Sequence, residues 1–107
     1  MDPTDEELLH AFYAAGDTST LERLAERLDP FLARIAYQIL QARTGSALQA
    51  LGEWDIDDRL GDLWTHVLAT RVAGLARWPH QRLTALTWLI HLLCIEMDRH
   101  LGFRAPF

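Results

Sequence analysis

The sequence is poor in cysteine and has no long hydrophobic run, and both shortages exclude classes of protein. Cys94 is the only cysteine, so the chain can form no internal disulfide and we expect a protein of the reducing cytoplasm. No secretory leader opens the sequence, which agrees with that expectation. The longest apolar run extends from Trp88 to Cys94, far below the roughly 18 to 20 residues that span a bilayer. We therefore expect no membrane segment.

Signatures of catalysis are also missing. The sequence contains no glycine-rich phosphate loop, no nucleophile elbow and no closely spaced cysteine pair. Glu96 and His100 lie four positions apart on one helix face, near Cys94 and Asp98, but zinc sites need about four ligands. A surface ion pair or cap near the end of a helix explains these residues better. We expect no metal, no cofactor and no enzymatic activity.

The composition of the chain and the spacing of its apolar residues predict one helical domain. Half of the 107 residues are hydrophobic, which allows a single domain over residues 1–107 to bury a core. Apolar residues recur at helical spacing, and no stretch of useful length alternates as a strand would. The sequence predicts an all-α, compact bundle of three to five helices.

Local signals set the bounds of the first two helices. Thr4 and Glu7 form a capping box, which predicts a first helix from Thr4 or Asp5 to near Ala15, before the stop at Gly16. A long periodic stretch follows from position 18 to about position 40.

Pro30 interrupts that long stretch, because proline removes a backbone donor and clashes with the preceding turn. It predicts either a kink or a second helix capped by Asp29. Residues 44–52 resemble a loop.

Two more helices are expected in the second half. One is capped by Asp55 and reaches about residues 71–73, and residues 74–82 form a connection. The last runs from position 83 or 84 to about position 101, ended by Gly102. This last helix is apolar on almost every side, so we expect it at the centre of the bundle.

Charge is unevenly distributed along the chain, whose formal net charge is −5. Residues 1–62 contain 13 acidic and 5 basic residues, whereas residues 63–107 contain 2 acidic and 5 basic residues. Because phosphate binding depends on basic side chains, an acidic chain is an unusual nucleic-acid binder. The difference in sign predicts one basic and one acidic partner, unless the acidic half is only a solvated surface.

Four aspartates gather at the expected start of the third major helix: Asp55, Asp57, Asp58 and Asp62. Capping and compensation of the helix dipole explain most of them, because carboxylates are stabilised near a helix N-terminus. Their spacing does not fit a calcium loop, which needs alternating ligands, a central glycine and a closing glutamate. The functional alternative is a docking face that steers a basic protein partner.

A cationic segment surrounds Trp78, with Arg77 before it and His80 and Arg82 after it. An exposed ring in such a segment could stack on an unpaired base, which contributes roughly 1 to 3 kcal/mol, while arginines bind phosphate. The alternative is that Trp78 fills the end of the bundle as a buried side chain. The sequence leaves both interpretations open.

Three stretches, in this order, resemble region 2 of bacterial sigma factors of the sigma-70 family, most closely the small extracytoplasmic-function group. Residues 4–40, TDEELLHAFYAAGDTSTLERLAERLDPFLARIAYQIL, are similar to the short helix, Gly-Asp turn and long helix that open these proteins. Residues 55–68, DIDDRLGDLWTHVL, resemble the family's core-binding segment. Residues 85–101, ALTWLIHLLCIEMDRHL, resemble its promoter-reading helix.

Individual positions carry this resemblance. Asp58 and Asp62 stand where the family has acids, Trp64 where it has an aromatic residue, and Trp88 and Leu89 match its last helix. In the family, the acidic helix and the long helix before it bind a coiled coil of core RNA polymerase. The last helix and the preceding loop open and read the −10 promoter element.

The sequence also departs from the family. Gly61 replaces a glutamine of the core-binding helix. Ile95 replaces an asparagine, Arg99 an aspartate and Gly102 an arginine of the promoter-reading helix. Asparagine can bond adenine in two places and isoleucine cannot, so promoter reading is the weakest part of the resemblance.

The resemblance implies a sigma factor region 2-like domain that binds core RNA polymerase and takes part in −10 promoter recognition and melting. The residues expected to bind polymerase are Asp55, Asp57, Asp58 and Asp62. Those expected to bind promoter DNA are Arg77, Trp78, His80, Arg82 and Arg99. An anti-sigma protein is a further candidate partner.

Two other functions remain open. One is a sigma-like adaptor or regulator that binds a protein partner without reading DNA, which Ile95, Gly102 and the net charge favour. The other is a helical interaction module unrelated to transcription.

Overall fold

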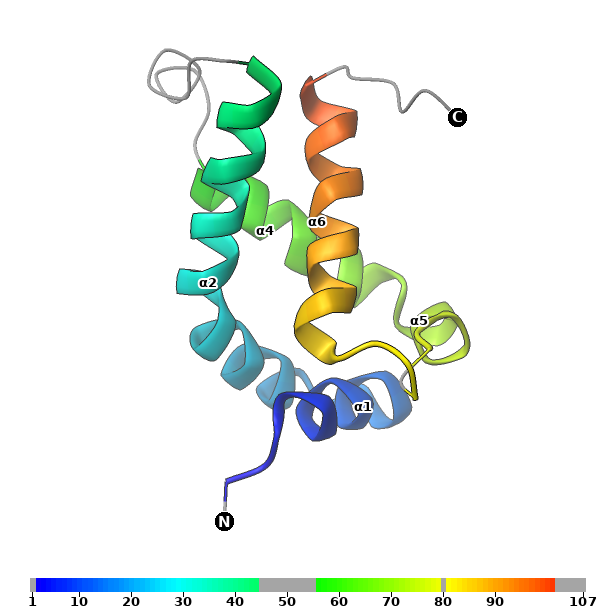
Figure 1. Cartoon of the computed structure of the whole chain (residues 1–107). Helices are drawn as coiled ribbons and strands as arrows, with labels where there is room; N and C mark the ends of the chain where they lie inside the picture. The colour runs from blue at the N-terminus through cyan, green and yellow to red at the C-terminus, as the bar shows by residue number, and fades with distance from the viewer. Residues whose placement is uncertain (1, 45–55, 80, 102–107) are drawn as a thin grey trace.

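The computed structural model describes residues 2–44, 56–79 and 81–101. Five helices make up this part of the chain: α1 (Asp5–Ala15), α2 (Thr18–Thr44), α4 (Ile56–Ala69), α5 (Arg71–Arg77) and α6 (Ala85–Leu101). α2 and α6 run side by side, α4 crosses both of them, and α1 closes one end (Figure 1). The prediction of an all-α bundle of three to five helices is confirmed.

α1 begins and ends where its local signals predict. The Thr4 side chain accepts a hydrogen bond from the backbone N–H of Glu7, and the Glu7 carboxylate accepts one from the backbone N–H of Thr4. Gly16 ends the helix at a φ of 74°, in the left-handed region that glycine adopts without strain. The buried face of α1 consists of Leu8, Leu9, Phe12 and Tyr13.

α2 continues through Pro30 as one helix, so the alternative of a second helix capped by Asp29 is wrong. Its ribbon changes direction between its lower and upper parts in Figure 1, as expected where a proline removes one helical hydrogen bond. At the start of α2, the hydroxyl and backbone N–H of Ser19 donate to the carboxylate of Asp17, which precedes the helix, and lower the pKa of that carboxyl. The predicted loop at 44–52 lies outside the described residues, apart from Thr44, which is helical.

The region after α4 differs from the sequence prediction. α4 ends at Ala69, and α5 follows where part of a connection was expected over residues 74–82. Gly74 lies inside α5, and its N–H donates to the carbonyl oxygen of Thr70 at 2.8 Å. The glycine therefore does not break a helix there. Its lack of a side chain instead makes room for Tyr13, which packs directly against it.

α6 is apolar on most sides, but Thr87, His91 and Ile95 are exposed along it, so it is not enclosed on every side by the other helices. It packs against α1, α2 and α4. Its start is close to the prediction, because Thr84 caps it by accepting a hydrogen bond from the N–H of Thr87 at 3.1 Å. Its buried residues are Ala85, Trp88, Leu89, Leu92, Leu93, Glu96 and Met97. Gly102, the predicted stop, lies outside the described residues.

Each helix in the described ranges is too short or too polar to cross a membrane.

Candidate functional site

The first two turns of α4 carry the aspartates expected to bind a protein partner. Asp57 and Asp58 are exposed in the first turn. Asp62 lies one turn further on with 40% of its side chain exposed, and it pairs with Arg59 at 3.3 Å. Asp55 lies outside the described residues. With Arg59 included, this surface keeps a negative charge, which attracts a basic partner.

Contacts on the other side of α4 hold these aspartates in place. Leu60, Leu63 and Val67 are buried and fix the helix on the core. The indole N–H of Trp64 donates to the Asp29 carboxylate of α2 at 2.8 Å. These contacts pack α4 against the core and against α2.

Arg77, the last residue of α5, and Arg82, in the connection between α5 and α6, are both exposed. The N–H of Arg82 donates to the carbonyl oxygen of Pro79 at 2.7 Å, which folds the connection into a turn. His80 lies outside the described residues. These two arginines can bind phosphate, since each ends in a guanidinium group that matches its oxygen geometry.

Trp78 is buried, which contradicts its expected role as a side chain that stacks on a DNA base. Only 2% of the residue is exposed, and its ring centroid lies 6.2 Å from that of Tyr13. Its indole N–H donates to the carbonyl oxygen of Leu83 at 3.1 Å. The other interpretation, a tryptophan that fills the end of the bundle, describes this arrangement.

Arg99 lies apart from the other two arginines. It is fourteen positions beyond the start of α6, a rise of about 21 Å along the helix. Although 63% of its side chain is exposed, its guanidinium lies 3.4 Å from the Glu96 carboxylate. Glu96 also lies 3.6 Å from His66 of α4. The structure therefore divides the predicted DNA-binding set instead of bringing it together.

The burial of Glu96 differs from a second prediction. The sequence suggested a surface ion pair or cap with His100, but only 5% of the Glu96 side chain is exposed. It lies between α4 and α6, where His66 and Arg99 approach its carboxylate. Because helix periodicity does not show which residues of α4 face α6, the sequence could not indicate His66 as a neighbour. The His100 side chain is outside the described part of the chain.

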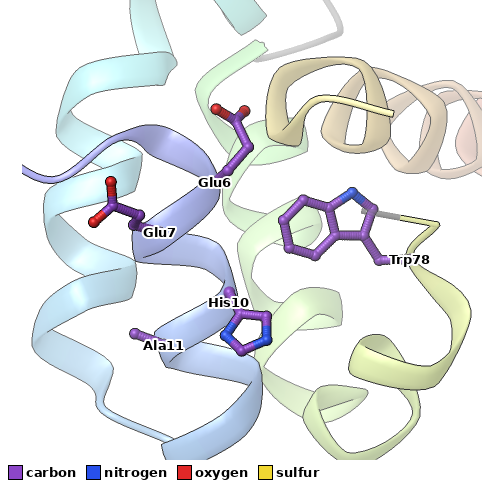
Figure 2. Close-up of a pocket in the computed structure, with 5 residues that line it drawn as sticks. All are labelled: Glu6, Glu7, His10, Ala11 and Trp78. Atoms are coloured by element: carbon purple, nitrogen blue, oxygen red, sulfur yellow. The ribbon is translucent and has the colours of Figure 1, made fainter. Parts of the chain in front are cut away.

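A hollow of about 330 Å³, which the sequence did not indicate, lies between α1 and Trp78. Its lining consists of Glu6, Glu7, His10, Ala11 and Trp78. Figure 2 shows the indole of Trp78 pointing toward α1, with the Glu6 and Glu7 carboxylates and the His10 ring projecting from that helix. The spacing of three and four places the α1 residues on one face, but only the tertiary structure brings Trp78 opposite them.

Within the described ranges, no three histidine, cysteine, aspartate or glutamate side chains form a group that could hold a metal ion. Comparisons with known protein families, with curated proteins and with solved structures found no match.

Proposed function

We propose that the chain is a sigma factor-type domain that binds core RNA polymerase and takes part in −10 promoter recognition and melting. The observation that carries this proposal is the acidic start of α4, where Asp57 and Asp58 are exposed on a helix fixed to the core. The order of a short helix, a long helix and an acidic helix also agrees with the resemblance noted in the sequence. Such a surface would attract a basic, helical partner.

Arg77 and Arg82 are the residues proposed to bind promoter DNA. Both are exposed, Arg77 at the end of α5 and Arg82 in the short connection that follows, so they can reach phosphates of the same strand. Trp78 is not part of this proposal because its ring is buried. Arg99 is set aside as well, because Glu96 offsets its charge.

A second candidate is a sigma-like adaptor that binds a protein partner without reading DNA. The burial of Trp78 favours it, because the described part of the connection between α5 and α6 then presents no exposed aromatic ring to a base. The exposed Ile95 on α6 favours it too, since its side chain makes no hydrogen bond to a base edge.

Binding to purified core RNA polymerase tests the docking surface. The double substitution Asp57→Asn, Asp58→Asn should weaken binding by about tenfold at low salt, because two charges are lost from the contact surface. The control Asp2→Asn, Glu22→Gln removes two exposed charges elsewhere and should bind like the parent chain. Equal affinities for both variants, or a parent chain that does not bind, would refute the proposal.

Binding to a fluorescent single-stranded oligonucleotide of the −10 type separates the two candidates. If the arginines bind phosphate, Arg77→Ala, Arg82→Ala should lower the slope of log affinity against log salt by about 1.4. The control Arg23→Ala, Arg34→Ala, which removes two exposed arginines of α2, should keep the parent slope. A parent chain that binds polymerase but no oligonucleotide at low salt is the adaptor.

A further inference from the structure

The carboxylate of Glu6 reaches from α1 to the first residue of α6. It accepts the backbone N–H of Ala85 at 2.8 Å, although the two residues are 79 positions apart in the chain. The start of α6 lies beside α1 (Figure 1), and it directly follows the connection that carries Arg82. We propose that Glu6 is autoinhibitory: its negative charge weakens the binding of nucleic-acid phosphates by Arg77 and Arg82. This inference rests on the proposed binding of promoter DNA.

The three acidic residues in the first turn of α1 have different surroundings. Asp5 pairs with Arg27 of α2 at 3.1 Å, which offsets its charge. The Glu7 carboxylate accepts the N–H of the cap residue Thr4, in its own helix. Glu6 pairs with no arginine in the described part of the chain. The N–H that it accepts carries no net charge, so Glu6 brings a negative charge to the connection before α6.

This charge is close enough to act on a bound phosphate. Arg82 precedes Ala85 by three residues, so their backbones are at most about 10 Å apart. Trp78, the residue after Arg77, lines the same hollow as Glu6. A separation of about 10 Å is one Debye length at 0.1 M salt, and the partial burial of Glu6 reduces screening further. A phosphate at either arginine is therefore repelled by Glu6, and added salt weakens the repulsion.

A purely structural role of Glu6 predicts the opposite result. In that role the carboxylate only holds the start of α6 on α1, so its loss would loosen the connection and weaken binding. Glu6→Gln separates the two roles, because the amide oxygen can still accept the N–H of Ala85 while the negative charge is removed. An autoinhibitory residue predicts tighter binding, whereas a structural residue predicts equal or weaker binding.

Binding of the full chain to the fluorescent single-stranded oligonucleotide of the −10 type tests the proposal. At low salt, Glu6→Gln should bind about two- to fourfold more tightly than the parent chain, because one repelling charge is removed. The gain should disappear at high salt, where the charges are screened. Glu6→Asp keeps the charge on a shorter side chain and should show no gain.

A matched control separates a local effect from a change in net charge. Glu26→Gln removes one exposed negative charge from α2, so it has the same net charge as Glu6→Gln, and it should bind like the parent chain. Urea denaturation of each variant shows whether a difference in affinity comes from a loss of folded protein.

The possible outcomes distinguish this inference from the proposed function. Equal or weaker binding by a folded Glu6→Gln chain, or an equal gain in Glu26→Gln, would overturn the inference and leave promoter binding intact. Binding by Glu6→Gln but not by the parent chain would support it. If neither chain binds the oligonucleotide at low salt, promoter binding fails and this inference fails with it.

Discussion

At the scale of single residues, Tyr13 of α1 contacts both α5 and α6, which its place in the apolar pattern of α1 does not indicate. Its hydroxyl accepts the indole N–H of Trp88 at 3.1 Å, and its backbone carbonyl accepts a hydrogen bond from Arg71. Its ring packs against Trp78 and lies directly over Gly74. α1, α5 and α6 therefore meet at this one side chain.

Two helical glycines should respond oppositely to alanine. At Gly74 an added Cβ would overlap the Tyr13 ring, so Gly74→Ala should lower the free energy of unfolding by about 1 to 3 kcal/mol. At Gly61 a Cβ meets nothing within 4 Å, so Gly61→Ala should raise it by up to about 1 kcal/mol through helix propensity. Urea denaturation measures both free energies, and a Gly74→Ala chain at least as stable as the parent would contradict the packing of Gly74 on Tyr13.

Tyr13 should also make the fold sensitive to alkali. Burial raises the pKa of its phenol above 10.0, although the hydrogen bond from Trp88 acts in the opposite direction. The unfolded chain thus releases this proton at a lower pH than the folded chain. The resulting stability is complete below pH 10 and is lost as the pH rises through the folded pKa. Urea midpoints between about pH 9 and pH 11.5 should fall more steeply for the parent chain than for Tyr13→Phe. Parallel curves would show that another group is responsible.

At the scale of helices, α2 and α4 are joined by a polar contact as well as by apolar packing. Asp29 precedes Pro30 in α2, and its carboxylate accepts the indole N–H of Trp64. The sequence suggested Asp29 as a cap of a separate helix, but the structure uses its carboxylate between helices. This contact adds to the apolar packing of Leu60, Leu63 and Val67 that holds α4 on the bundle.

The bond between Asp29 and Trp64 should be measurable in a double-mutant cycle. Asp29→Ala alone leaves a half-buried indole N–H without its acceptor and should cost about 1.5 kcal/mol of unfolding free energy. In a Trp64→Phe background, which lacks the donor, the same substitution should cost much less. Equal costs in the two backgrounds would show that the hydrogen bond does not contribute.

At the scale of the whole molecule, Trp78 closes one end of the bundle. It belongs to the short connection after α5, yet it packs against Tyr13 of α1 and bonds to Leu83 near the start of α6. A residue in this position contributes to the stability of the entire fold, because it holds three helices at one point.

Removal of the Trp78 ring should therefore destabilise the whole chain. Trp78→Ala should lower the free energy of unfolding by about 3 to 5 kcal/mol, as expected for a large buried ring. The adjacent exposed residue provides the control, since Arg77→Ala should change the free energy of unfolding by no more than about 0.5 kcal/mol. A Trp78→Ala protein as stable as the control would restore the interpretation of an exposed, base-stacking ring.

Features that depend on residues close together in the chain were predictable. The capping box of Thr4 and Glu7 and the stop at Gly16 follow from spacing and composition, and the structure confirms them. The acidic start of α4 was equally visible as a cluster of aspartates. In each case the interacting groups lie within one or two helical turns, so local geometry brings them together.

The sequence by itself determined α1, α2, α4 and α6 and the charges they carry, because helical hydrogen bonds and caps join neighbours in the chain, whereas α5 was not predicted. Tertiary packing alone decided the burial of Trp78, the role of Gly74, the position of Glu96 beside His66 and the hollow next to α1. The groups that meet at these places come from different helices. A periodic pattern shows that a face is buried but does not specify which distant side chain covers it.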